Sequence, residues 1–469
     1  MSMPRLATAA ASIAGLVFIA SCGSSSSVPI GIPPTTAPRP APLPTAIPAA
    51  PTVSAAGIPA TGPSGCDADN AGLTLPAGFC AGVWARNVTS VRRMVVAPNG
   101  DVFAISNRGG GGRGRAGAAA PPPRGVFRLR DTNRDGKADT AIVVAAGTGA
   151  GLAIAHGALY AEGGGTVIVR YPFRPGTNEL SGTADTIVSG LPTGGHSTRD
   201  FVIRGTDLFV NIGSAGNVCP GGRGTPPANP CPELEQRAGI WRFDATRVGQ
   251  AYGSAQRYAS GVRNGTALVL DPRDNQLYVG QHGRDNLIQW NNATPEYNAE
   301  NPGEEFFRVI EGGEYGWPYC YYSHEVNKKV LAPEYGGDGK QEARCAQMQQ
   351  PVYAFPGHWA PNAAMFYTGT QFPGEYREGV FIAFHGSWNR GSQPEDQRGF
   401  NVTFLPMRDG RATGAHRVFA DQFRWLASQG GTRPPRNHRP TGLAQLTDGS
   451  LLVSDDAMST IFRIVYIGR

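Results

Sequence analysis

The sequence predicts an all-β protein, a six-bladed β-propeller with a disordered N-terminal tether. The first observation is a hairpin pattern that occurs six times: an apolar run, a turn rich in Pro, Asn, Asp or Gly, and a second apolar run. The second is the spacing, because strand pairs that recur at intervals of tens of residues are typical of one pair per blade. The third is a leading segment of Ser, Pro, Ala and Thr with too few large apolar residues to pack.

The predicted hairpins follow one another along the chain. They comprise residues 94–104, 152–160, 201–210, 268–279, 365–382 and 443–453. The first and last are the clearest, since Pro-Asn-Gly-Asp and Thr-Asp-Gly turns separate their apolar runs, whereas the fifth has a longer turn. A propeller holds its chemistry on loops at the mouth of its central channel, so the loops beside these hairpins are the candidate functional segments.

Three segments are predicted along the chain. Residues 1–21 resemble a signal peptide, with Arg5, an apolar stretch and small residues at the end. The sequence Ile-Ala-Ser-Cys at 19–22 resembles a bacterial lipobox and predicts lipidation of Cys22. The alternatives are an ordinary secretory signal or a membrane span, for which the stretch is short.

Residues 22–65 are the predicted tether and residues 66–469 the propeller domain. We expect a lipid-anchored protein of the cell envelope that faces the periplasm, at the outer membrane if the source is Gram-negative.

The charge balance is basic, with a net charge of +6. No dense Lys/Arg helix is visible, which disfavours nucleic acid as a partner and leaves a basic site for an anionic ligand open. Apart from Cys22, six cysteines remain, and an even number in an exported protein favours disulfides. Their order suggests Cys66–Cys80, Cys219–Cys231 and Cys320–Cys345, out of 15 pairings that six cysteines allow. A metal site is less favoured, because no Cys-x-x-Cys pair occurs.

Polar clusters lie beside the hairpins. They span residues 194–199, 261–266, 281–285, 358–362, 385–390 and 437–440. Equivalent strand ends face the same side of a propeller, so we expect the clusters that precede hairpins three to six to converge on one mouth. Several Arg and His with few acids favour an anionic ligand, since Arg suits bidentate carboxylate binding. A neutral His can serve as a base near physiological pH.

From about residue 72 to 464 the chain resembles the soluble PQQ-dependent sugar dehydrogenases, and most of all their L-sorbosone dehydrogenase-type branch. The resemblance rests on the motifs at 195–199, 261–264, 313–318, 383–390 and 439–443. It implies a six-bladed propeller that binds pyrroloquinoline quinone (PQQ) and calcium over the channel mouth. It also implies a sugar substrate and a separate electron acceptor, a cytochrome or a membrane quinone, because no haem-attachment Cys-x-x-Cys-His occurs.

The resemblance implies roles for particular residues. His196 matches the general base, which takes the sugar hydroxyl proton as hydride passes to the quinone. Arg263 matches the residue that stabilises negative charge on the quinone oxygen, with Asn264 beside it. Arg439 matches a carboxylate-binding arginine.

The resemblance also shows departures. His385 and Arg390 lie where the relatives have a cofactor-binding Lys, which is absent here, and His358 replaces a small hydroxyl residue. Backbone carbonyls after the fourth hairpin, here those of His282 and Gly283, would hold the calcium that polarises the quinone.

Two further segments leave alternatives open. Asp131, Asn133 and Asp135 alternate as in the front half of an EF-hand loop, but Ile142 stands where the closing Glu would fall. The segment is therefore either a structural calcium site or a polar turn between the first and second blades. The aromatic residues of an insertion at 301–350 either stack on a sugar or form a packed mini-core.

The function that we expect is oxidation of an aldose, or of a sugar aldehyde such as a sorbosone, to a lactone or acid. A propeller sugar lactonase is one alternative, which the Arg- and His-rich clusters disfavour because such an enzyme needs carboxylate ligands for its metal. The other is a lipid-anchored carbohydrate- or protein-binding propeller without redox activity. The missing Lys and the changed calcium loop keep that alternative open.

Overall fold

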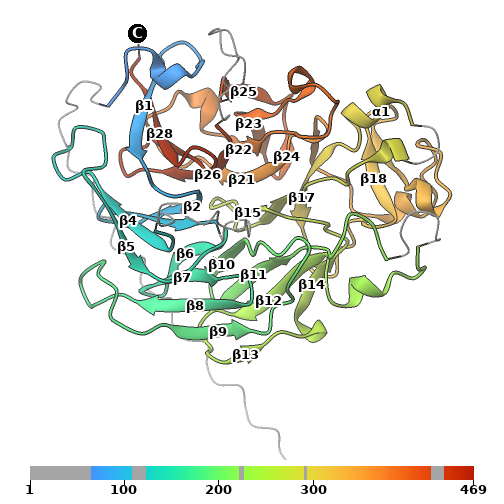
Figure 1. The fold of residues 1–469 in the computed structure, drawn as a ribbon, viewed down its shortest axis with the longest axis horizontal. Coiled ribbons are helices and arrows are strands. Elements are labelled where there is room, and N and C mark those ends of the chain that lie inside the picture. Colours follow the sequence, from blue (N-terminus) through green and yellow to red (C-terminus); the bar gives the residue numbers. More distant parts are fainter. Residues whose placement is uncertain (1–64, 108–122, 221–226, 290–292, 424–437, 469) are drawn as a thin grey trace, which may run out of the picture. The chain divides into compact units, whose positions relative to one another are not determined.

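Six sheets of four or five strands surround a central axis in the computed structural model (Figure 1). The structure describes residues 65–107, 123–220, 227–289, 293–423 and 438–468. The predicted signal peptide, Cys22 and the tether lie outside the described residues. No helix among the described residues is long and apolar enough to cross a membrane.

The first three blades run in chain order, each from its inner strand outward. Blade one contains β2 (Val91–Val96), β3 (Val102–Ser106), β4 (Val126–Arg130) and β5 (Thr140–Ala145). Blade two contains β6 (Leu152–Ala155), β7 (Ala158–Gly163), β8 (Val167–Pro172), β9 (Asp185–Ser189) and, at its edge, β13 (Gln250–Ala251). Blade three contains β10 (Phe201–Arg204), β11 (Asp207–Ile212), β12 (Gly239–Asp244) and β14 (Arg257–Ser260).

The last three blades complete the ring. Blade four contains β15 (Ala267–Leu270), β16 (Leu277–Gly280), β17 (Glu304–Val309) and β20 (Tyr353–Phe355). Blade five contains β21 (Pro361–Phe366), β22 (Gly379–His385), β23 (Phe400–Arg408), β24 (Arg411–Ala412) and β25 (Arg417–Ala420). Blade six contains β26 (Pro440–Gln445), β27 (Leu451–Asp455), β28 (Thr460–Tyr466) and β1 (Phe79–Arg86).

The six-bladed propeller predicted from the repeats is confirmed. Every predicted hairpin is the inner strand pair of one blade, as the pairing of Met94 with Ala104 and of Leu443 with Val453 illustrates. The first strands of successive blades contact one another around the axis, and the strand from the start of the described chain, β1, closes the last blade by pairing with β28. The sequence pattern did not predict this closure, because β1 pairs with residues almost 400 positions away.

Six hydrophobic clusters hold the ring together, one between each pair of neighbouring blades. Leu208 packs with blade two, whereas the next residue, Phe209, packs with blade four, because successive side chains of a strand point to opposite faces. Both faces of each blade are therefore buried. This is why the hairpins appear in the sequence as continuous apolar runs instead of alternating ones.

An insertion follows the third strand of blade four. It contains the hairpin of β18 (Cys320–Ser323) and β19 (Lys328–Leu331), which lies with helix α1 (Pro295–Glu300) outside the blade on the right of Figure 1. The insertion was predicted to start at residue 301, but 304–309 form β17. The sequence pattern could not separate β17 from the insertion, because both segments contain apolar and aromatic residues.

The aromatic residues of the insertion form a packed mini-core, which settles one of the two alternatives. Tyr315, Trp317, Tyr319 and Tyr321 are all buried, whereas Tyr322 and Tyr335 are partly exposed. Two disulfides, Cys219–Cys231 and Cys320–Cys345, pack into the same cluster as Trp317 and Tyr319. The third bridge, Cys66–Cys80, fastens the leading segment to β1. All three predicted pairings are therefore confirmed.

Candidate functional site

The predicted site residues come from equivalent positions in neighbouring blades. His196, Arg263, His358 and Arg439 precede the first strands of blades three to six, while His282 and His385 lie at the ends of second strands. Because the first two strands of a blade are antiparallel, the start of one and the end of the other meet at the same end of the propeller. The charges of Arg263, His196 and His385 all act on the pKa of His282, as expected for side chains gathered at one mouth.

His196 is a largely enclosed histidine held by Ser214. Its Nδ1 lies 3.1 Å from the carbonyl oxygen and 2.9 Å from the hydroxyl oxygen of Ser214. A proton on Nδ1 that is donated to the carbonyl leaves Nε2 as the proton acceptor. Burial and then the nearby Arg263 lower the pKa of His196 to about 4. The imidazole is therefore neutral at physiological pH and ready to accept a proton.

Arg263 is 3% exposed and surrounded by oxygen atoms. Its Nη1 donates to the carbonyl oxygens of His282 (3.3 Å) and Gly283 (2.8 Å), and its Nη2 to Oδ1 of Asn217 (3.0 Å) and Oδ2 of Asp285 (3.0 Å). Its Nε donates to the Asn217 carbonyl at 3.4 Å. All five N–H groups of the guanidinium are thus engaged within the protein.

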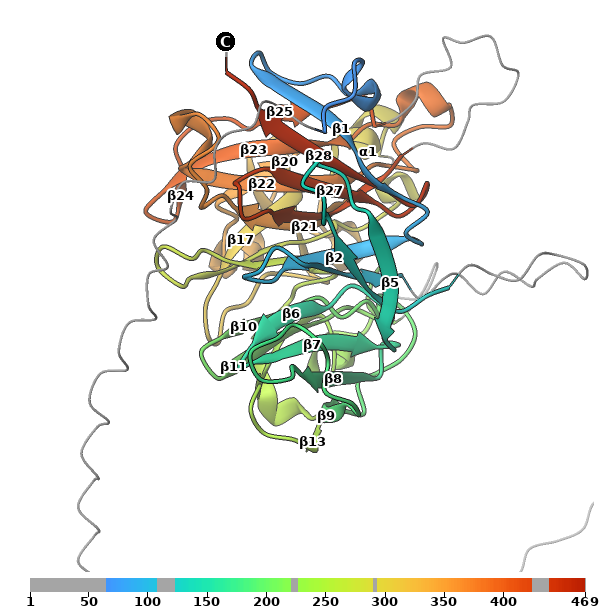
Figure 2. The same cartoon turned by 90° about the vertical axis from the view of Figure 1, so that its left-hand side faces the viewer.

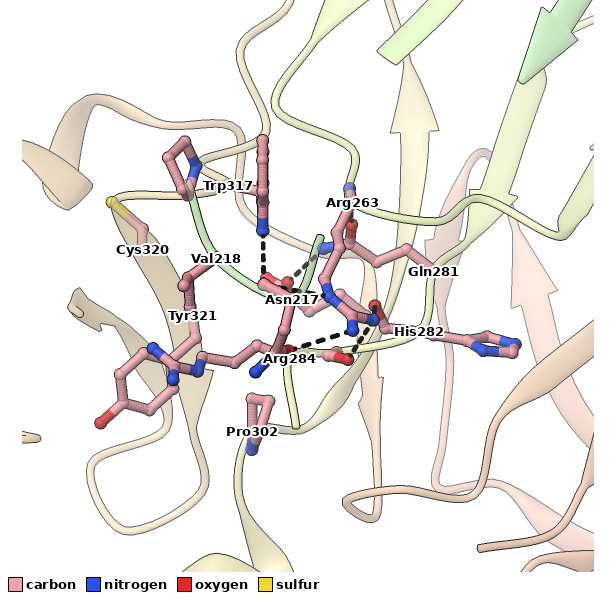
Figure 3. Close-up of a pocket in the computed structure, with 13 residues that line it drawn as sticks. Asn217, Val218, Arg263, Gln281, His282, Arg284, Pro302, Trp317, Cys320 and Tyr321 are labelled. Atoms are coloured by element: carbon pink, nitrogen blue, oxygen red, sulfur yellow. Dashed lines mark hydrogen bonds between the residues drawn. The ribbon is translucent and has the colours of Figure 1, made fainter. Parts of the chain in front are cut away.

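A small pocket opens beside this guanidinium, between blades three and four and the insertion (Figure 3). Trp317 forms one wall, and its indole N–H donates to the Asn217 carbonyl at 3.1 Å. Figure 3 shows the ring of His282 directed away from Asn217 and Trp317, whereas the Arg284 side chain runs toward Tyr321. Arg284 forms a buried ion pair there with Glu334, which joins the loop after β16 to the insertion.

His282 occupies the centre of the gathered residues. Its Nε2 lies 2.9 Å from the Thr266 hydroxyl and 3.1 Å from Oδ1 of Asn362, and its Nδ1 lies 3.5 Å from Nδ2 of Asn264. Burial and the charge of Arg263 lower the pKa of His282 to about 3, so this ring is neutral as well. Oδ1 of Asn264 and Nδ2 of Asn362 are buried and without a hydrogen-bond partner among the described residues.

Arg92, Arg439 and Asp456 lie together on the side of the mouth formed by blades five, six and one. Asp456, just after β27, forms an ion pair with Arg92, whose Nε lies 2.8 Å from Oδ2, and its Oδ1 lies 2.8 Å from Nε2 of His385. Arg439 donates to the carbonyl oxygens of His385 and Gly386, at 2.8 and 2.6 Å. Burial raises the pKa of the Asp456 carboxyl, but Arg92, His385 and Arg439 together hold it well below its usual range.

His358 and Arg390 are oriented toward α1. Nε2 of His358 lies 2.8 Å from the Asn298 carbonyl and 3.0 Å from that of Asn301. Arg390 pairs with Glu300 and donates to the Gly357 carbonyl. These contacts engage two side chains to which the resemblance assigned a role in cofactor binding. Their cofactor contact therefore stays a prediction without support from this arrangement.

Beneath the mouth, Arg93 of blade one crosses the centre of the ring. Its guanidinium pairs with Asp200 of blade three and donates to the carbonyl oxygens of Ala150 and Thr266, at 3.2 and 3.0 Å. Burial raises the pKa of Asp200 to about 7, against the opposing effect of Arg93. Through these contacts Arg93 ties four blades together.

Sequence reasoning missed several residues of the mouth. Asp456 could have been found from its position, because it follows a second strand as His282 and His385 do. Asn217 lies in the loop between β11 and β12, and nothing in its surroundings in the sequence marks it. Trp388 is 65% exposed, the most exposed large hydrophobic side chain among the described residues. Its neighbour Asn389 anchors that loop by donating to Oδ1 of Asp285 at 2.7 Å.

The residues of the mouth fit a polyanionic quinone better than they fit calcium. Arg92 and Arg439 supply positive charge, and the unsatisfied atoms of Asn264 and Asn362 offer an acceptor and a donor on either side of His282. For calcium the fit is poor, because both predicted carbonyl ligands, those of His282 and Gly283, accept hydrogen bonds from Arg263. No group of three His, Cys, Asp or Glu side chains suited to a metal occurs among the described residues.

The second predicted calcium segment joins β4 and β5 within blade one. The expectation that a turn here would connect blades one and two is wrong, because β5 belongs to the first blade. The carboxylates of the turn serve its own backbone: Asp131 accepts from the N–H of Gly136 at 2.9 Å and Asp135 from that of Lys137 at 2.8 Å. The side chain of Asn133 accepts from the N–H of Asp135. Calcium binding at these three residues stays a prediction.

Comparisons with known proteins agree with this fold. The model of the TrAA12-like family matches residues 73–466, so the chain belongs to that family. The PQQ domain of a pyranose dehydrogenase from Coprinopsis cinerea has a similar structure, with a TM-score of 0.65 and 20% identity over 84% of this chain and 97% of that one. A calcium structure of a Trichoderma reesei protein of carbohydrate-active enzyme family AA12 gives a TM-score of 0.67 and 18% identity over 87% and 98%.

Two further similarities are more distant or partial. The soluble aldose sugar dehydrogenase of Escherichia coli gives a TM-score of 0.52 and 13% identity over 83% of this chain and 99% of that one. An uncharacterized protein from Borreliella burgdorferi is 30% identical over 209 residues, which are 44% of this chain and 48% of the relative. The match thus spans about half the length of that curated relative. The resemblance to soluble PQQ-dependent sugar dehydrogenases is confirmed at the level of family and fold.

Proposed function

We propose that the protein is a PQQ-dependent sugar dehydrogenase that oxidises an aldose, or a sugar aldehyde of the sorbosone type, to a lactone or acid. The observation that carries the proposal is His196, a neutral imidazole whose Nδ1 faces Ser214 and whose Nε2 is left as the acceptor. The family match and the neighbours named as a pyranose dehydrogenase PQQ domain and an aldose sugar dehydrogenase support the same chemistry.

The residues of this chain divide the work. Nε2 of His196 takes the proton from the sugar hydroxyl, while the hydrogen on the same carbon leaves with its electron pair. When bound, the quinone supplies the chemistry that accepts this hydride. Arg92 and Arg439 would hold its carboxylates, while burial and the positive charge of Arg263 keep His196 unprotonated. The proton is released from His196 to solvent as the electrons pass to a separate acceptor, a cytochrome or a membrane quinone.

The envelope location belongs to the same proposal. Lipidation of Cys22 would anchor the chain and hold it facing the periplasm, close to a membrane-bound acceptor. The flexible composition of residues 22–65 supports a tether role, because Ser/Pro-rich segments are extended spacers.

One observation favours the alternative of a carbohydrate- or protein-binding propeller without redox activity. Every N–H group of Arg263 is engaged within the protein, so none is offered to a quinone oxygen in this arrangement. The lactonase alternative has less support, since the mouth carboxylates Asp285 and Asp456 are paired with Arg263 and Arg92.

The test is dye reduction by the full-length chain with a panel of aldoses and sugar aldehydes, with and without PQQ. We expect reduction that requires PQQ and falls about 10²–10⁴-fold in His196→Ala. The matched control is His438→Ala, which removes a mouth histidine that pairs with Asp455 instead of Ser214 and should keep most of the activity. PQQ that neither binds nor supports reduction would overturn the proposal in favour of the binding propeller.

A further inference from the structure

The insertion reaches the mouth through a buried ion pair. Lys329 of β19 is completely buried, and its Nζ lies 2.9 Å from Oε1 of Glu305 in β17. The same ammonium donates to the Tyr315 carbonyl oxygen and lies 4.6 Å from the centre of the Phe307 ring. The attraction within a buried pair is largely offset by the cost of removing both charges from water, so such a pair adds little net stability. Its presence is better explained by what the Glu305 carboxylate holds in place.

The Glu305 carboxylate orients the side-chain amide of Gln281, the residue that follows β16. Its Oε2 accepts from Nε2 of Gln281 at 2.7 Å. An ionised carboxylate only accepts hydrogen bonds, so it determines which end of the amide faces it. The other end, Oε1 of Gln281, accepts from the backbone N–H of Arg263 at 2.8 Å (Figure 3). Gln281 is buried, and this orientation of its amide satisfies both partners.

The backbone of Arg263 is in turn joined to the proposed base. Its carbonyl oxygen accepts from the N–H of Ser214 at 2.8 Å. The Ser214 hydroxyl donates to the Gly216 carbonyl at 2.6 Å, so both oxygens of Ser214 beside Nδ1 of His196 act as acceptors. A continuous series of polar contacts therefore runs from Lys329 in the insertion to His196 at the mouth.

We propose that Glu305 and Gln281 are positioning residues, through which the insertion fixes the backbone of Arg263 and the tautomer of His196. Displacement of that backbone would move Ser214, and Nδ1 of His196 would lose the oxygens that keep its proton there. Nε2 would then carry the proton in part of the molecules and could not accept one from a substrate.

The proposal rests on the proposed function, because it concerns the geometry of the base. Its test reads the tautomer of His196 without PQQ, sugar or dye, so its failure is distinct from failure of the dehydrogenase activity. The experiment is nitrogen NMR at neutral pH on the full-length, cofactor-free chain that carries isotope-labelled histidine. The signals of His196 are those that His196→Ala removes. In the wild type we expect a protonated Nδ1 and an unprotonated Nε2.

Glu305→Gln reverses the orientation of Gln281 at almost constant shape. The ammonium of Lys329 requires an acceptor, so it binds the new amide oxygen and turns the new amide nitrogen toward Gln281. Oε1 of Gln281 then faces that nitrogen, which places its Nε2 against the N–H of Arg263, donor against donor. The Nε2 signal of His196 should therefore shift toward the protonated value as the two tautomers mix.

A second substitution tests orientation directly. Gln281→Glu added to Glu305→Gln restores the series with its polarity exchanged, because one carboxylate oxygen at position 281 accepts from the new amide and the other from Arg263. The wild-type signals of His196 should return. Gln281→Met removes both hydrogen bonds and leaves the pair of Lys329 with Glu305 intact. It should also mix the tautomers, and it supplies the comparison if Glu305→Gln does not fold.

Glu334→Gln is the matched control. It breaks the buried ion pair with Arg284, which also joins the loop after β16 to the insertion. The melting temperature should fall, while the tautomer of His196 stays as in the wild type. Wild-type His196 signals in both Glu305→Gln and Gln281→Met would overturn the proposal. Mixed tautomers in Glu334→Gln or in the combined variant would overturn it too, since the effect would then follow lost stability instead of the orientation at position 281.

Discussion

The two sides of the mouth use arginine in opposite ways. Where blades three and four meet, the five N–H groups of Arg263 donate hydrogen bonds to protein oxygens, one of which belongs to the carboxylate of Asp285. Where blades five, six and one meet, Arg439 donates to two carbonyl oxygens that carry no net charge. Its charge is compensated only over a longer range, by Asp456 and Asp455. Burial alone therefore does not say whether an arginine can bind an external anion.

This difference assigns different tasks to the two sides. In the proposed function the first side holds the base, because burial and then the nearby Arg263 lower the pKa of His196 and keep it neutral. The second side keeps positive charge available and places His385 against Asp456, where it orients that carboxylate between the arginines. The proposed function thus assigns proton transfer to one side of the mouth and anion binding to the other.

The largest effect that tests this contrast is on PQQ affinity. Arg439→Met should weaken PQQ binding by about 10–100-fold, since a hydrogen bond from a charged donor contributes roughly 1.5–3 kcal/mol. Titration of the cofactor against quenching of tryptophan fluorescence measures the affinity. Arg390→Met is the matched control, because the charge of Arg390 is paired with Glu300, and its affinity should change by no more than about three-fold. Equal losses of PQQ affinity in Arg439→Met and Arg390→Met would contradict the difference between the two sides of the mouth.

The pH profile of turnover sharpens the role of the first side. A base must be neutral to accept a proton, and a lowered pKa keeps His196 neutral to lower pH. The value of kcat/KM should therefore stay level from pH 8 to about 5 and fall only as the pH approaches 4, provided that the chain remains folded. A histidine with an ordinary pKa would lose activity below about pH 6.5.

Arg263→Met supplies the control for this profile. The positive charge of Arg263 is one cause of the lowered pKa, so its removal should move the acidic midpoint upward. An unchanged midpoint in that variant, or a wild-type midpoint near 6.5, would show that the two residues are not coupled as described.

The smallest effect concerns the rim between the two sides. Trp388 is 65% exposed on a loop that Asn389 anchors to Asp285, so its ring is available to pack against the face of a sugar. Trp388→Ala should raise KM for the sugar by about 3–10-fold, while the melting temperature stays the same and Trp388→Phe restores most of the affinity. Steady-state kinetics measures KM, and calorimetry measures the melting temperature. A lower melting temperature with an unchanged KM would contradict the role of Trp388 in sugar binding.

Local sequence signals were sufficient for the inner hairpins, the disulfide pairs and the location of the mouth. Each hairpin joins strands that are neighbours in the chain, and a turn such as Pro98-Asn99-Gly100 defines it without help from elsewhere. The disulfide partners are separated by 12, 14 and 25 residues, so short loops already favour them. The proximity of His196 to Arg263 was expected, because both precede the first strands of neighbouring blades.

The tertiary structure alone decided which groups are available at that mouth. The motif containing Arg263 marks it as a site residue, but its five acceptors come from residues 217 to 285, across two blades. In the same way, α1 takes the polar groups of His358 and Arg390, and the insertion buries Trp317 while Trp388 stays exposed. Charge compensation and burial depend on distances between segments far apart in the chain, and a pattern of residue types along one segment does not contain those distances.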